Sequence, residues 1–161
     1  MSPPVIFMIG CGEGIGSSIA KCFATQGFSL GLIAKSQQIL DLTTSMPCFN
    51  PFNVKISTET TDTTSFKGVK RALELLEEDM GGPDVVVYNV SDPGKLHDES
   101  LVKDAATQES LEHLKACIPG ALATAQWAVK NMESSRPKGK KTVEFNYNNV
   151  FGTSTDRICR P

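Results

Sequence analysis

Short apolar runs alternate with stretches of helical periodicity along most of the chain. The clearest runs are Val5–Ile9, Ser29–Ala34 and Asp84–Asn89, and continuous runs of this length are typical of strands buried on both faces of a parallel sheet. The clearest helical stretch is Thr64–Met80, which places on one face Phe66, Val69, Leu73, Leu76 and Met80. This alternation predicts an α/β fold in which helices connect parallel strands.

Two further strands are expected from shorter patterns. One covers Cys48–Val54, and Pro47 and Pro51 place it at the edge of the sheet because proline donates no ladder hydrogen bond. The other covers Thr142–Phe145, where the charge of Glu144 suits an exposed edge. The sequence therefore predicts a mostly parallel sheet of about five strands.

The remaining helices are expected from their periodicity and their ends. A short helix is expected at Gln37–Leu42, and Asp62 or Thr63 is expected to cap the helix that begins at position 64. A long helix is expected over Ser100–Met132, broken or kinked near Pro119-Gly120 because proline removes a helical hydrogen bond.

Three glycines, Gly10, Gly14 and Gly16, lie between the first strand and the helix that follows it. Glycines permit a sharp turn and leave backbone N–H groups open to a phosphate, which the positive end of the helix also attracts. The arrangement favours a dinucleotide-binding turn in a Rossmann-like three-layer fold with strand order 3-2-1-4-5. The alternative is a tight turn that binds no ligand.

The end of the second strand bears on which dinucleotide is bound. NAD binders hold the ribose hydroxyl with an acidic residue about 20 positions past the glycines. This sequence has Lys35 and Ser36 there, and it has no Asp or Glu between Gly14 and Asp41. A cation and a hydroxyl suit a 2′-phosphate, so NADP(H) is preferred over NAD(H). The alternative for Lys35 is an ordinary solvated lysine.

Composition and charge are those of an ordinary globular protein. The 161 residues, of which 40% are hydrophobic and 21% charged, are enough for one domain with a real core. The net charge of −2 gives no basic surface for a nucleic acid. No apolar run approaches the ~20 residues of a membrane span. The N-terminus lacks the basic region of a secretory signal, so neither a nucleic-acid nor a membrane partner is expected.

The cysteines and histidines point to neither disulfides nor a metal site. The five cysteines include no Cys-x-x-Cys, and the only histidines are His97 and His113. Free thiols fit a cytoplasmic protein. Cys11, inside the glycine turn, is either a small residue suited to a tight turn or an oxidation-sensitive thiol.

The sequence resembles the short-chain dehydrogenase/reductase family. Ile9–Gly16 is similar to its Thr-Gly-x-x-x-Gly-Ile-Gly motif, with Ile9 in place of Thr. Asn53-Val54 resembles the Asp-Val pair that follows the third strand and contacts adenine, and Asn89 matches an asparagine after the fourth strand. The resemblance implies hydride transfer between a nicotinamide cofactor and a carbonyl or alcohol. The cofactor contacts that it implies are Gly10, Gly14, Ile15, Gly16, Lys35, Ser36, Asn53 and Asn89.

The family's catalytic positions are altered in this sequence. Its chemistry uses a Ser together with a Tyr-x-x-x-Lys pattern that transfers the proton. Asn149 stands at the Ser position, and Cys117 stands at the position of a catalytic Asn on the long helix. The 161 residues contain no Tyr-x-x-x-Lys, and the tyrosine is expected beyond Pro161. Catalytic residues are therefore unassigned, with Tyr147 or Cys117 as an unconventional alternative.

These observations lead to one domain and several functions. We expect residues 1–152 to form an NAD(P)-binding domain, incomplete relative to the family, and residues 153–161 to form an irregular tail. The functions left open are an NADP(H)-binding protein without standard turnover, a non-catalytic interaction scaffold, and an incomplete product of a functional NADP-dependent reductase gene. A homo-oligomer or partner contact is expected through Ser100–Met132, because that helix commonly packs in the family's dimers.

Overall fold

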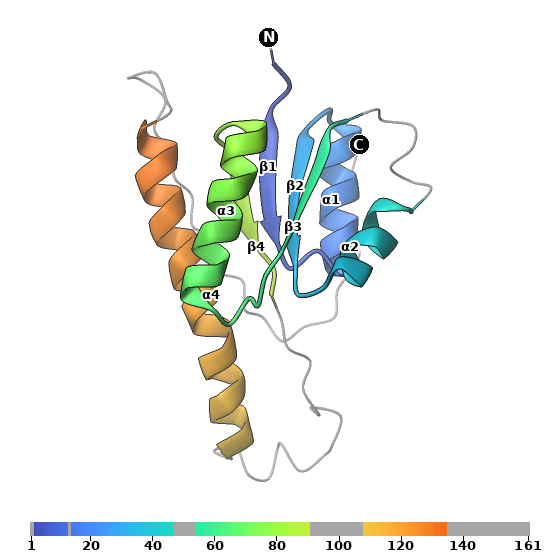
Figure 1. The fold of residues 1–161 in the computed structure, drawn as a ribbon. Helices are drawn as coiled ribbons and strands as arrows, with labels where there is room; N and C mark the ends of the chain where they lie inside the picture. Colours follow the sequence, from blue (N-terminus) through green and yellow to red (C-terminus); the bar gives the residue numbers. More distant parts are fainter. Residues whose placement is uncertain (1, 13, 47–53, 91–107, 135–161) are drawn as a thin grey trace.

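The computed structural model describes residues 2–12, 14–46, 54–90 and 108–134. Within these ranges the strands form one parallel four-stranded sheet in the order β3-β2-β1-β4 (Figure 1). The strands are β1 (Val5–Ile9), β2 (Ser29–Ala34), β3 (Ile56–Thr60) and β4 (Val85–Tyr88). The order confirms the Rossmann-like arrangement. The fifth strand expected at Thr142–Phe145 lies outside the described residues.

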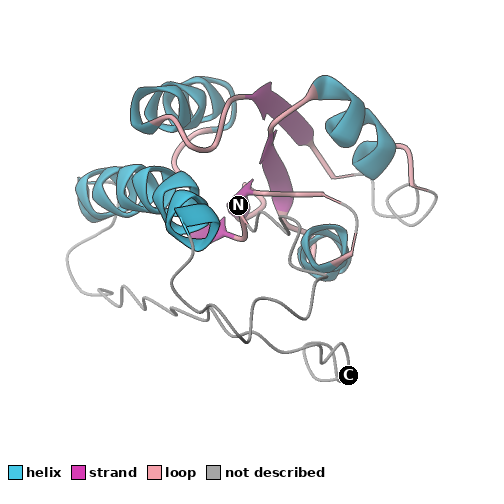
Figure 2. Cartoon of the chain, turned by 90° about the horizontal axis from the view of Figure 1, so that it is seen from below, coloured by secondary structure: helices cyan, strands magenta, loops and turns pink. Residues whose placement is uncertain are grey.

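Helices cover both faces of the sheet and complete three layers (Figure 2). The helices are α1 (Ile15–Thr25), α2 (Gln37–Thr44), α3 (Phe66–Met80) and α4 (Gln108–Ser134). One hydrophobic core lies under α1 and α2, and the other lies under α3 and α4. Because successive side chains of a strand point to opposite faces, Met8 joins the first core and Phe7 the second.

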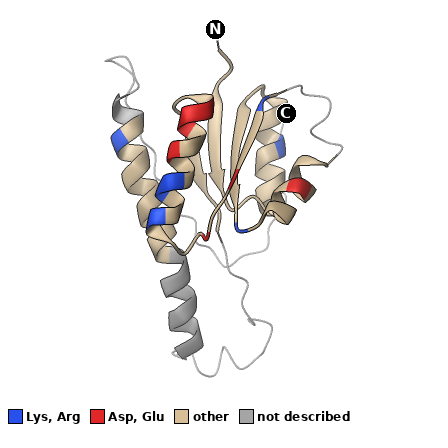
Figure 3. Cartoon of the chain, in the orientation of Figure 1, with Lys and Arg blue, Asp and Glu red and all other residues tan. Residues whose placement is uncertain are grey.

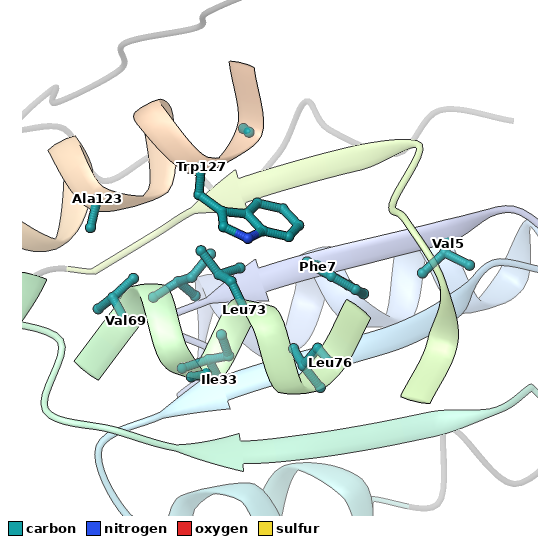
Figure 4. Close-up of a cluster of buried hydrophobic side chains, with 11 residues drawn as sticks. Val5, Phe7, Ile33, Val69, Leu73, Leu76, Ala123 and Trp127 are labelled. Carbon is teal, nitrogen blue, oxygen red and sulfur yellow. The ribbon is translucent and has the colours of Figure 1, made fainter. Parts of the chain in front are cut away.

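The central strand β1 is buried along its whole length. On the side of α3 and α4, Phe7 packs against Trp127, whose ring centroid lies 5.9 Å away (Figure 4). At the start of the strand, the Val5 N–H donates to the Asp84 carboxylate over 2.9 Å, and the Asp84 N–H donates to the Val5 carbonyl over 2.8 Å. A strand covered on both faces needs apolar side chains at every position, which explains its uninterrupted apolar sequence.

The third strand lies later in the chain than the sequence predicted. The placement of the third strand at Cys48–Val54 is wrong, because the strand beside β2 is β3 and covers Ile56–Thr60. Residues 48–53 themselves lie outside the described residues. β3 is the outer strand beside β2, so the expected edge position is confirmed. Its first four residues are half-buried and include the polar Ser57 and Glu59. A half-buried strand needs no continuous apolar run, and a search for such runs therefore missed it.

The start of α3 also differs from the prediction. The N-cap is Ser65, whose Oγ accepts a hydrogen bond from the Gly68 N–H over 3.1 Å. The prediction of either Asp62 or Thr63 as the cap is therefore wrong. The Asp62 carboxylate instead accepts from the Thr64 N–H over 3.0 Å. Any of several polar residues in a row can cap a helix, so the sequence alone does not select one.

The long helix α4 continues through Pro119, so of the predicted break or kink near Pro119-Gly120 the break is wrong, and the kink stays a prediction. Proline costs the helix one backbone hydrogen bond, and the burial of Ala123 and Trp127 on the following turns holds the segment against the sheet. Gly120 allows a close approach at this point, because a Cβ there would overlap the Thr63 carbonyl and lie 2.7 Å from the Tyr88 hydroxyl. Among the described helices none is both long and apolar enough to span a bilayer.

The charges of α3 oppose its helix dipole (Figure 3). Its first half carries Lys67, Lys70 and Arg71, and its second half carries Glu74, Glu77, Glu78 and Asp79. Negative charge is favoured at a helix N-terminus and positive charge at its C-terminus, so this order is unfavourable. The half-exposed ion pair of Lys55 with Asp79, 2.8 Å long, offsets only part of the effect. The position of α3 therefore depends on its buried face.

Candidate functional site

The turn between β1 and α1 requires glycine at two positions. Gly10 has a φ of +88° and Gly14 a φ of +92°, and side chains other than hydrogen are strained in this conformation. The chain thereby leaves the buried end of β1 and enters α1 within a few residues. The predicted glycine turn is present at the carboxyl end of the central strand, on the edge where ligands of open α/β sheets bind.

Glycine is also required for close packing around this turn. A Cβ on Gly16 would lie 2.6 Å from the Gly10 carbonyl oxygen and 2.9 Å from the Cys11 Cα. A Cβ on Gly10 would overlap the backbone carbonyl of Asn89. Helix α1 and the loop after β4 therefore both approach the turn as closely as backbone atoms allow.

Two hydrogen bonds from Asn89 join the end of β4 to the end of β1 and the glycine turn. Its backbone N–H donates to the Ile9 carbonyl over 2.8 Å, and its side-chain Nδ2 donates to the Gly10 carbonyl over 3.2 Å. The structure thus places this predicted site residue directly beside Gly10. The side chain acts on the shape of the turn through a backbone oxygen.

The N-terminus of α1 has no side chain that caps it. Its N-cap residue is Gly14, which offers no side-chain acceptor, and the described first turn carries no acidic residue. The hydroxyls of Ser17 and Ser18 donate to the Gly14 carbonyl, over 3.0 and 2.8 Å, and so turn away from the helix N–H groups. Ile15, the first helical residue, is exposed. The Ser17 N–H donates to the Gly12 carbonyl over 3.1 Å, so the N–H groups that an anion could meet at this helix end are those that precede Ser17.

Lys35 and Ser36 lie at the end of β2, the strand next to β1. The register pairs Ile9 with Ile33, so both strands end on the same edge of the sheet. Lys35 is exposed. The Ser36 oxygen accepts from the Ile39 N–H over 3.5 Å as the N-cap of α2, which leaves its hydroxyl proton available to a ligand. The pair thus presents a cation and a donor beside the turn.

Asp62 is a site candidate that the sequence reasoning missed. It follows β3, and the Thr61 N–H donates to the Ala34 carbonyl over 3.0 Å, which ties this segment to the end of β2. Hydrogen bonds from the Thr64 N–H and hydroxyl, and the nearby charge of Lys35, hold the pKa of Asp62 below its usual range. Correct placement of the third strand would have revealed this acidic residue after it.

The position of β3 also bears on the prediction that Asn53 contacts the cofactor. Asn53 is expected as a cofactor contact because Asn53-Val54 resembles the Asp-Val pair that follows the third strand, but in the structure β3 begins after this pair, at Ile56. Asn53 itself lies outside the described residues, as does Asn149. Cys117 falls within the backbone of α4, and its side chain is not among those described. The described residues contain no group of three or more His, Cys, Asp or Glu that could hold a metal ion.

Cys11 and Thr43 form a buried contact under the glycine turn. The Thr43 Oγ1 donates to the Cys11 carbonyl over 2.9 Å, and both residues are fully buried. Burial raises the pKa of the Cys11 thiol to about 11. A protonated, inaccessible thiol is a poor nucleophile, so the structure favours the reading of Cys11 as a small residue suited to the turn.

Comparison with known proteins gives one family and one fold. A family model described as short chain dehydrogenase matches residues 4–141. L-Sorbose reductase from Gluconobacter frateurii, solved with NADPH and L-sorbose, is 24% identical over 83% of this chain, with a TM-score of 0.67. A 3-ketoacyl-ACP reductase from Sinorhizobium meliloti 1021 is 20% identical over 81%, with a TM-score of 0.68. This chain spans 49% of each of those chains, and no curated protein matches it.

Substitution of Gly16 tests the packing of the turn. We expect Gly16→Ala to lower the free energy of unfolding by about 1–3 kcal/mol, because its methyl group meets backbone atoms that cannot move aside. Gly12→Ala is the matched control, since a Cβ there meets nothing within 4 Å, and its effect should stay within about 0.5 kcal/mol. Urea unfolding measures both, and equal effects would contradict this account.

Alkylation tests the state of Cys11. In the folded protein at pH 8, iodoacetamide should modify the partly exposed Cys22 at least about tenfold faster than the buried Cys11. Peptide mass spectrometry distinguishes the two sites, and urea should remove the difference. Rapid native modification of Cys11 would be the contrary result.

The raised pKa of the Cys11 thiol predicts that the free energy of unfolding falls at alkaline pH. Because burial raises the Cys11 pKa from 9.0 to about 11, its contribution to stability is present below pH 9 and is lost as pH rises toward 11. Cys11→Ala should show a smaller loss over that range.

Proposed function

Because the chain belongs to the short-chain dehydrogenase family, as its match over residues 4–141 shows, we propose that it binds NADP(H) at the glycine turn. The observation that carries the proposal is the N-terminus of α1, where no described side chain caps the helix and where a Cβ on Gly12 or Gly14 of the preceding turn would meet nothing within 4 Å. Such a turn lets a pyrophosphate approach the backbone, and the helix N-terminus favours its negative charge.

The end of β2 supports NADP(H) over NAD(H). A 2′-phosphate there meets the exposed cation of Lys35 and the free proton of the Ser36 hydroxyl. Asp62 lies close enough to Lys35 to interact with its charge, and its carboxylate accepts hydrogen bonds from the N–H and hydroxyl of Thr64. The NADPH in the similar L-sorbose reductase supports the same choice.

We propose that cofactor binding by these 161 residues occurs without the family's standard proton transfer. The sequence contains no Tyr-x-x-x-Lys, and Asn149 stands at the family's Ser position. A longer product of the same gene that carries the pattern would instead be an ordinary NADP-dependent reductase. Sequencing the transcript beyond the codon for Pro161 separates these two possibilities.

Titration with cofactor tests the binding proposal. NADPH should bind saturably, followed by its fluorescence, and NADH should bind about tenfold or more weakly. Lys35→Ala should weaken NADPH by about tenfold and leave NADH nearly unchanged, because only NADPH carries the phosphate. Lys21→Ala, which removes an exposed lysine from α1, is the matched control. A folded chain that binds neither cofactor would refute the proposal.

A second candidate role is assembly through α4, and an exposed apolar stripe favours it. Ile118, Leu122 and Val129 lie within about 40° of one another around the helix axis. Their exposed fractions are 47%, 52% and 38%. Neighbouring exposed apolar side chains on one helix face are typical of a protein contact. We therefore propose that this stripe contacts a second copy of the chain. The buried Cys11, whose thiol is in no disulfide, fits a cytoplasmic protein.

A charge placed within the stripe tests this role. Leu122→Lys should shift a dimer toward monomer in light scattering after size-exclusion chromatography, because the ammonium group loses its water in the contact. Leu42→Lys is the control, since Leu42 is equally exposed, at 49%, but lies on α2 across the sheet. A wild-type chain that is monomeric at all concentrations would contradict the proposal.

A further inference from the structure

Thr43 has an unusual combination of burial and bonding for a helical threonine. It lies in the last turn of α2 with no exposed surface. Its Oγ1 is 2.9 Å from the Ile39 carbonyl, one helical turn earlier, and 2.9 Å from the Cys11 carbonyl in the glycine turn. The first contact is the local one that threonines make in helices. The second joins residues 32 positions apart in the sequence.

The hydroxyl has one proton to share between these two oxygens. The Ile39 carbonyl already accepts the Thr43 backbone N–H through the ordinary hydrogen bonding of the helix. The Cys11 carbonyl lies in the turn, beyond the last residue of β1, and Cys11 is fully buried. A buried carbonyl without a donor costs about 1–3 kcal/mol. The proton therefore stabilises the structure more at Cys11 than at Ile39.

This hydrogen bond fixes the peptide group between Cys11 and Gly12. The described backbone contains no cis peptide, and in a trans peptide the C=O and N–H point in opposite directions. With the Cys11 carbonyl directed at α2, the Gly12 N–H points away from α2. A Cβ on Gly12 would meet nothing within 4 Å, so no described atom packs closely against the Cα of Gly12 in that direction.

We propose that Thr43 is a positioning residue of the dinucleotide site, whose hydroxyl orients the Cys11–Gly12 peptide so that the Gly12 N–H faces the bound pyrophosphate. This inference rests on the proposed binding of NADP(H) at the turn. It adds a function to α2, whose N-cap Ser36 lies beside the proposed 2′-phosphate position and whose last turn carries Thr43, bonded to the Cys11 carbonyl of the glycine turn. The one helix thus contacts both ends of the site.

Cofactor and fragment binding test the role of Thr43. Thr43→Val removes the donor and should weaken NADPH about tenfold. Thr43→Ser keeps the hydroxyl and should restore affinity to within about threefold of wild type. 2′-AMP carries the phosphate for Lys35 and Ser36 but no pyrophosphate, so its affinity should not change in either variant.

Thr44→Val is the matched control. Thr44 is the next residue of the same helix, and its Oγ1 donates only within α2, to the Leu40 and Asp41 carbonyls over 2.9 and 3.4 Å. Its loss should leave NADPH affinity unchanged. A general loosening of α2 would instead weaken NADPH and 2′-AMP together, and that result would overturn the inference.

A measurement without cofactor keeps this inference separate from the proposed function. The Gly12 amide resonance in the 15N–1H spectrum of the free protein should shift in Thr43→Val and stay in place in Thr43→Ser and Thr44→Val. If wild type binds NADPH but Thr43→Val binds it equally well, only the role of Thr43 is refuted. If wild type does not bind NADPH, the proposed function fails, and an unmoved Gly12 resonance would show that Thr43 does not orient the peptide either.

Discussion

The hydrogen bonds that converge on the end of β1 fix the geometry on which the rest of the site depends. The Gly10 N–H donates to the Ile33 carbonyl of β2 over 2.9 Å, and the Asn89 N–H donates to the Ile9 carbonyl from the end of β4. The Asn89 side chain then holds the Gly10 carbonyl. The ends of β1, β2 and β4 are thus joined where the chain turns. A side chain at Gly10 would not fit there, because its Cβ would overlap the Asn89 carbonyl.

This convergence produces a site made mainly of backbone, and such a site depends on rigid support. N–H groups can meet a phosphate only if each peptide is held in one orientation. Asn89 supports the turn from β4, Gly16 allows α1 to approach, and Thr43 reaches the Cys11 carbonyl from α2. Among the described residues, charge lies at the border of the turn, in Lys35 and in Asp62 near it. In the proposed function, the support from Asn89, Gly16 and Thr43 would hold the backbone for the pyrophosphate, and Lys35 would distinguish NADP(H) from NAD(H).

The sequence predicts those parts of the site that a short run of neighbouring residues specifies. β1 and β2 are buried along their length and read as continuous apolar runs, and the glycines between strand and helix mark the turn. β3 gave no such signal, because an outer strand keeps polar residues such as Glu59. The contact of Thr43 with Cys11 spans 32 positions, and no local pattern specifies which buried carbonyl a threonine will meet. The misplaced third strand then concealed Asp62.

The same topology separates cofactor binding from catalysis. Every described contact that shapes the turn comes from residues between Val5 and Asn89, on β1, β2, β4, α1 and α2. The family's proton transfer uses residues that follow a further strand, and this chain spans about half the length of the structures it resembles. A binding site held together by the first four strands does not require those residues for its shape. The described contacts that shape the glycine turn thus lie in the first four strands and their helices, so the proposed cofactor binding can be tested separately from turnover.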